Sequence, residues 1–63
     1  MTEPTPTPVL RLLVVDDHEV VRQGLVALLD RRDGFQVVAE AGTVAEAIET
    51  ARRFRPDIVV MDV

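Results

Sequence analysis

The 63-residue sequence predicts an α/β fold, a parallel sheet with helices packed on it. Strand-like and helix-like patterns alternate along the chain in the order strand, helix, strand, helix, strand. The first strand-like segment is apolar on both faces, as central strands of parallel sheets are, and turn-forming residues separate the segments that follow. We expect strands at about 9–15, 35–41 and 57–61 and helices at about 18–31 and 44–54.

The first strand and the first helix are predicted from their apolar patterns. Residues 9–15 are apolar except for Arg11, which predicts a strand covered on both faces. The helix that follows has an apolar stripe at helical spacing, formed by Val21, Leu25, Leu28 and Leu29. Gly24 interrupts this helix, and we expect a close contact with the sheet to require a small residue there.

The second strand differs from the first because one of its faces is partly polar. Asp33 and Gly34 end the first helix and turn the chain. In the strand that follows, Gln36 and Glu40 alternate with apolar residues. This pattern favours a strand at the edge of the sheet.

The second helix and the third strand have clear boundaries in the sequence. Thr43 and Glu46 have the spacing of a capping box, which predicts that the helix begins there. The buried stripe of this helix is formed by Val44, Ala47, Ile48 and Ala51. Pro56 ends the helix, and the apolar run at 58–61 predicts another central strand, followed by Asp62.

These elements predict a strand order of 2-1-3. Crossovers between parallel strands are right-handed, the most apolar strand belongs in the middle, and the partly polar second strand belongs at an edge. The two helices then cover opposite faces of the sheet. This is the beginning of the flavodoxin-like order, in which ligands bind outside the carboxyl ends of strands one and three.

Three aspartates follow the two strands that meet at this point. Asp16 and Asp17 come directly after the first strand, and Asp62 comes directly after the third. Because neighbouring strands lie about 4.8 Å apart, we expect the three carboxylates to share one pocket. They would repel one another without a cation, and a hard divalent ion such as Mg²⁺ is the natural one. Magnesium beside an aspartate suggests phosphoryl transfer, with one aspartate as the nucleophile.

Three segments carry a family resemblance, namely VVDDHEVVRQGL, VVAEAGT and PDIVVMD. In this order and spacing they resemble the first half of a response-regulator receiver domain, a CheY-like fold. They are most similar to the LuxR/NarL type of two-component transcriptional regulator. The resemblance covers residues 9–63 and leaves out a Thr/Pro-rich leader at 1–8, which we expect to be flexible.

The resemblance implies a role for each of the three acids. Asp62 would be the phospho-acceptor, Asp17 a direct Mg²⁺ ligand, and Asp16 an acid that holds the metal through water. A histidine kinase would be the phosphodonor. Receiver domains catalyse their own phosphotransfer, so the chain is not expected to be an enzyme in its own right. The parent protein would bind DNA through a C-terminal domain that this sequence does not include.

The sequence also departs from the family pattern. Receivers continue with a carbonyl metal ligand, a Thr or Ser, and a Lys, and this chain has no lysine. We therefore expect the isolated chain to be unstable, to self-associate, or to pair with another receiver. An alternative function is that of a phosphorylation-incompetent fragment that acts by association alone. A phosphatase with an aspartate nucleophile fits less well, because such enzymes place an acid where His18 stands.

Simpler structural interpretations exist for several of these residues. Asp16 and Glu19 also have the spacing of a capping box for the first helix. His18 fits a loop position beside the pocket, and Thr43 fits a helix N-cap, since it follows the wrong strand for the family's switch hydroxyl. Cations near helix C-termini complement the helix dipole, which accounts for Arg31, Arg32, Arg52, Arg53 and Arg55.

Composition and charge exclude several other classes of protein. The net charge is −4 and no basic tract is present, which argues against direct nucleic-acid binding by this segment. There is no cysteine for a disulfide or a thiolate metal site. No apolar run approaches the roughly 20 residues of a membrane span, and the start of the chain lacks the features of a signal peptide. We expect a cytoplasmic protein with no membrane contact.

Overall fold

The structure is a computed structural model that describes residues 8–62. Its elements are β1 (Leu10–Val15), α1 (Glu19–Asp30), β2 (Phe35–Ala41), α2 (Val44–Phe54) and β3 (Ile58–Met61). The predicted alternation of strands and helices is therefore confirmed. The expected leader lies outside the described residues except for Pro8, which is exposed.

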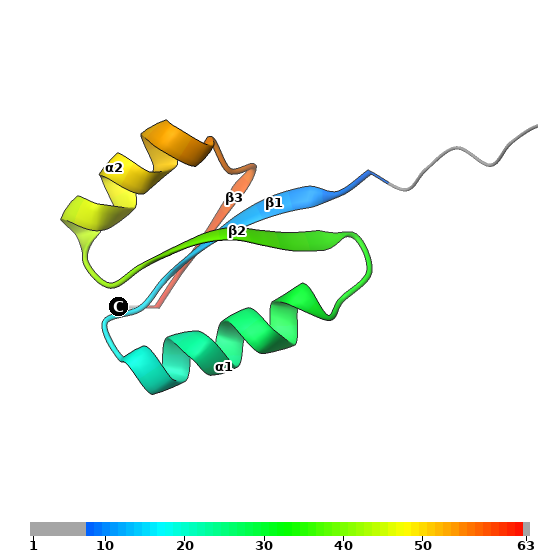
Figure 1. Ribbon diagram of the computed structural model, residues 1–63, viewed down its shortest axis with the longest axis horizontal. Coiled ribbons are helices and arrows are strands. Elements are labelled where there is room, and N and C mark those ends of the chain that lie inside the picture. Colours follow the sequence, from blue (N-terminus) through cyan, green and yellow to red (C-terminus); the bar gives the residue numbers. More distant parts are fainter. Residues whose placement is uncertain (1–7, 63) are drawn as a thin grey trace, which may run out of the picture.

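The three strands form a parallel sheet in the order β2-β1-β3, as predicted. The two helices lie on opposite sides of this sheet (Figure 1). Val15, the last residue of β1, is aligned with Ala41 at the end of β2 and with Met61 at the end of β3. Because of this register, all three strands end at the same edge of the sheet, and the loops after β1 and β3 start side by side.

The core is centred on β1. Residues 12–15 are buried, and their side chains alternate between the two faces of the sheet. On the face covered by α2, Leu13 and Val15 pack with Ala41 and Ala47. Burial of a Leu or Val side chain stabilises the fold by about 1.5–3 kcal/mol, so this one strand supplies a large part of the stability.

The third strand is much more exposed than the first. Within residues 8–62, β3 has β1 as its only neighbouring strand, so the central position expected for β3 is not found there. Ile58, Val59 and Met61 are exposed. Val59 and Met61 also line an apolar depression of about 170 Å³ between β3 and α2. An apolar strand with one free edge is a surface on which another chain can pair.

The two helices begin in different ways. Thr43 is the N-cap of α2, as predicted, and its hydroxyl accepts a hydrogen bond from the Glu46 amide at 3.1 Å. The capping box that Asp16 and Glu19 could have formed at α1 is not found. His18 occupies the N-cap position of that helix, and its side chain makes no capping hydrogen bond. No helix within residues 8–62 is long and apolar enough to cross a membrane.

The close contact expected at Gly24 is not found. Gly24 is exposed, and apart from its own helix backbone no atom of residues 8–62 lies within 4 Å of the place a Cβ would take. Gly34 is different, because its φ of +89° belongs to the left-handed region that side chains rarely adopt. The turn requires a glycine at position 34, whereas the packing does not require one at position 24.

We predict that Gly24→Ala raises the free energy of unfolding by roughly 0.5–1 kcal/mol, since alanine has the higher helix propensity and nothing obstructs its methyl group. Urea unfolding followed by circular dichroism would measure the change. Gly34→Ala is the matched control and should lower the stability, because its backbone would be strained. Destabilisation by Gly24→Ala would contradict the open environment seen at this helix position.

We predict that the isolated 63-residue chain self-associates through the exposed edge of β3. Sedimentation velocity over a range of concentrations should show species larger than a monomer. Val59→Lys places a charge on that edge and should shift the distribution towards the monomer. A dilute wild-type monomer with a cooperative thermal transition would overturn this prediction.

Candidate functional site

The predicted acids lie around one depression at the carboxyl edge of the sheet. This depression has a volume of about 360 Å³, and its lining includes Asp16, Asp17 and Asp62. Gly42 and Thr43, from the loop between β2 and α2, line another part of it. Residues that are far apart in the sequence thus meet at one place, as the strand order led us to expect.

Backbone hydrogen bonds that extend the sheet locate two of these acids. The Asp16 amide donates to the Ala41 carbonyl at 3.1 Å, which extends the pairing of β1 with β2. The Asp62 amide donates to the Val15 carbonyl at 3.1 Å, which extends the pairing of β1 with β3. The positions of both acids therefore follow from the register of the strands.

Asp16 is a buried acid, with a relative exposure of 2%. Its Oδ1 accepts a hydrogen bond from the His18 amide at 2.8 Å, which makes a local turn of the kind that aspartates often form. The Asp16 carboxylate therefore accepts a hydrogen bond from an amide of the loop and not from one inside α1. A buried carboxylate is stable only with hydrogen bonds or a positive partner, and this one faces the depression.

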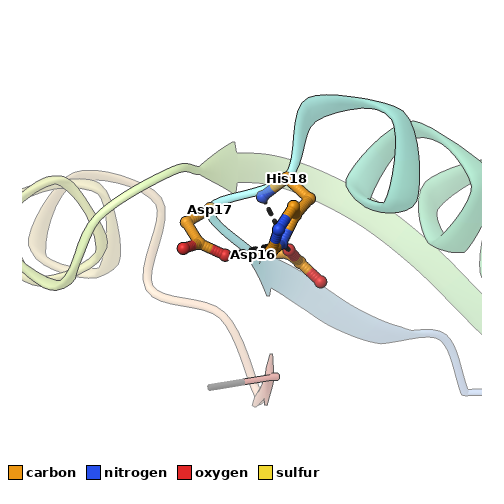
Figure 2. Close-up of side chains that lie close together, drawn as sticks. All are labelled: Asp16, Asp17 and His18. Carbon is orange, nitrogen blue, oxygen red and sulfur yellow. Dashed lines mark hydrogen bonds and ion pairs between the residues drawn. The ribbon is translucent and has the colours of Figure 1, made fainter.

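Asp17 and His18 differ from Asp16 because both side chains are 76% exposed. Nδ1 of His18 lies 2.9 Å from Oδ1 of Asp17 and 3.5 Å from Oδ1 of Asp16. Figure 2 shows these three side chains together in the segment between β1 and α1. Sequence reasoning placed His18 beside the pocket but did not anticipate these contacts. The only indication of these contacts in the sequence is that Asp16, Asp17 and His18 are consecutive.

The donor atoms at this site fit a hard divalent cation. One ligand atom from each of Asp16, Asp17 and His18 lies within 4.8 Å of the other two. Carboxylate oxygens are the donors that Mg²⁺ prefers, and Mg²⁺ usually retains several waters, for which the open depression has room. Asp62 lies on the same depression and follows a different strand, but it is not in the group of residues whose ligand atoms lie within 4.8 Å of one another.

Comparison with known proteins places the chain in a family. The profile of the response regulator receiver domain matches residues 12–63. The chain is 48% identical over 54 residues to the response regulator GacA of Pseudomonas viridiflava. It is 52% identical over 54 residues to the DNA-binding transcriptional activator DevR/DosR of Mycobacterium tuberculosis. Each alignment covers 86% of this chain and 25% of the relative, so the chain spans about a quarter of the length of these curated relatives.

A solved structure agrees with this assignment. The fold is similar to that of a LuxR-family two-component response regulator from Aurantimonas sp. SI85-9A1, with a TM-score of 0.76 and 47% identity. The match covers 81% of this chain and 36% of that one. The sequence profile, the identity to the relatives and the strand order agree, and the chain belongs to the response regulator receiver domain family.

Proposed function

We propose that this chain acts in phosphorelay signalling, as a receiver segment that accepts a phosphoryl group on Asp62. The observation that carries the proposal is that Asp16, Asp17 and Asp62 line one depression at the end of two neighbouring parallel strands. Membership of the receiver family supports the same function. Asp62 is exposed, so a donor can reach its carboxylate.

The proposed reaction is a transfer from phosphohistidine to aspartate. A carboxylate oxygen of Asp62 attacks the phosphorus atom, and the bond between phosphorus and the donor's imidazole nitrogen breaks. The electron pair of that bond returns to the imidazole, and Asp62 becomes an acyl phosphate. A Mg²⁺ ion at this site would neutralise charge on the phosphoryl oxygens.

Asp16 and Asp17 have separate tasks in this proposal. Asp17 is exposed and next to the depression, which suits a direct ligand. Asp16 is buried and bonded to the loop, which suits an acid that orients metal-bound water.

We infer the partners from the family. GacA is named a response regulator and DevR/DosR a DNA-binding transcriptional activator. The donor for this chain is accordingly a histidine kinase, and the parent protein is a cytoplasmic transcriptional regulator. Binding to DNA belongs to a part of the regulator outside these residues.

A second candidate function rests on the exposed surface of β3. This strand and the apolar depression beside it offer a place for another chain to pair. The chain would then act by association with another receiver and without phosphorylation. Phosphate incorporation separates the two candidates.

We predict that the wild-type protein incorporates phosphate from radiolabelled acetyl phosphate in the presence of Mg²⁺ and that Asp62→Asn does not. The amide of asparagine is too weak a nucleophile to form the acyl phosphate. The label should be lost on treatment with hydroxylamine, which cleaves acyl phosphates.

Asp33→Asn is the matched control for this experiment. It removes the same charge from an exposed turn at the far end of α1, and it should be labelled as well as the wild type. Equal labelling of the wild type and Asp62→Asn would overturn the assignment of the acceptor. A wild type that is folded and takes up no label would favour the association function.

A further inference from the structure

We propose that Arg22 is a positioning residue for the acidic site, whose side chain holds the turn that carries Asp16 and Asp17 in the shape required for Mg²⁺ binding. This inference rests on the proposed function, because it assigns to Arg22 a part in the affinity of that same site. Arg22 lies in α1 and does not belong to the lining of the depression.

The side chain of Arg22 contacts the turn between β1 and α1. Its Nη1 donates to the backbone carbonyl of Asp16 at 2.8 Å. The backbone amide of Arg22 donates to the carbonyl of His18 at 2.8 Å, which is the first hydrogen bond of α1 and does not depend on the arginine side chain. The carboxylate of Asp16 accepts from the amide of His18 within the same turn. The guanidinium therefore holds the backbone on the N-terminal side of Asp17, and the first turn of α1 holds the backbone on the other side.

The guanidinium of Arg22 is itself held by the second strand. Nε of Arg22 lies 3.2 Å from Oε1 of Glu40, and the Arg22 side chain is only 19% exposed. Glu40 is followed in β2 by Ala41, whose carbonyl accepts from the amide of Asp16. Asp16 is thus linked to the end of β2 in two ways. Its amide bonds directly to Ala41, and its carbonyl accepts from Arg22, whose guanidinium also bonds to Glu40.

Gly42 leaves the space that this guanidinium occupies. A Cβ at position 42 would lie 3.1 Å from Nη1 of Arg22, which is closer than most Cβ contacts in proteins. Within residues 8–62, Gly34 is the one glycine with a positive φ, so the backbone of Gly42 accepts an alanine. The glycine at position 42 is explained by the space for Arg22 and not by its own backbone conformation.

A positioning role and simple electrostatic repulsion predict opposite effects of Arg22 on the affinity for Mg²⁺. As a positive charge close to the acids, Arg22 would repel Mg²⁺, and its removal would raise the affinity. As the residue that holds the turn, it keeps two ligands in place, and its removal would lower the affinity. Groups that orient metal ligands in this way typically change metal affinity by about 10–100-fold.

The test is a set of Mg²⁺ titrations by isothermal calorimetry on the folded protein, with urea unfolding of each variant in the absence of metal. Arg22→Ala should lower the affinity about tenfold or more. Arg22→Lys should recover part of the loss, because one ammonium reaches the Asp16 carbonyl but cannot also form the fork to Glu40. Arg32→Ala, which removes the same charge from an exposed position, should bind Mg²⁺ at least as tightly as the wild type.

A second variant tests the same contact with every charge retained. Gly42→Ala should push Nη1 of Arg22 away by a few tenths of an ångström and lower the affinity less than Arg22→Ala does, and adding it to Arg22→Ala should cause little further loss. If Arg22→Ala fails to fold, weaker Mg²⁺ binding by Gly42→Ala alone supports the role of Arg22, and unchanged binding overturns it.

The proposed function and this inference fail in different ways. A wild type that binds no Mg²⁺, or an Asp17→Asn variant that binds it as well as the wild type does, overturns the proposed site itself. If the wild type binds Mg²⁺ and Asp17→Asn weakens binding, unchanged or tighter binding by both Arg22→Ala and Gly42→Ala overturns the role of Arg22.

Discussion

β1 pairs in parallel with a strand on each side, and this pairing sets the positions of β2, β3 and the loops that follow the strands. Burial of residues 12–15 on both faces keeps β1 in the middle of the sheet, and the register brings Ala41 and Met61 level with Val15. The common depression of the three acids follows from that alignment. If β1 shifted by one residue relative to its neighbours, Asp16 would move away from Asp62. The side chains of β1 would also turn to the opposite face of the sheet.

The acids at the end of β1 are held in place by the backbone more than by one another. Asp16 is tied to β2 by its amide, to α1 through Arg22, and to the loop by its carboxylate. Three carboxylates on one open depression would otherwise move apart. The fold therefore contributes a fixed framework, and a cation would contribute the charge that the acids lack. This division of tasks suits a site that binds its metal reversibly.

Much of the fold could be predicted from the sequence because it depends on patterns with a clear period. The continuous apolar run of β1, the polar residues of β2 and the cap at Thr43 led to the observed elements and strand order. The shared depression of Asp16, Asp17 and Asp62 followed from that order. These features depend on burial and on how the strands are connected, and both can be inferred from the pattern of apolar and polar residues in the sequence.

Other features could not be predicted, because they depend on which of several possible partners a side chain selects. The spacing of Asp16 and Glu19 also fitted a capping box for α1, whereas the Asp16 carboxylate accepts from the His18 amide in the loop. Gly24 and Gly42 look alike in the sequence, yet only Gly42 has a neighbouring side chain close to it. The contact between Arg22 and the Asp16 carbonyl joins a helix to a strand end, and no periodic pattern encodes it.

In the proposed phosphorelay, Asp62 is the residue that receives the phosphoryl group. Borohydride reduces an aspartyl phosphate to homoserine, so mass spectrometry after phosphotransfer and reduction identifies the modified residue directly. The account predicts homoserine at position 62 in a reaction that requires Mg²⁺. Homoserine at position 16 or 17, or stable phosphate on His18, would contradict it.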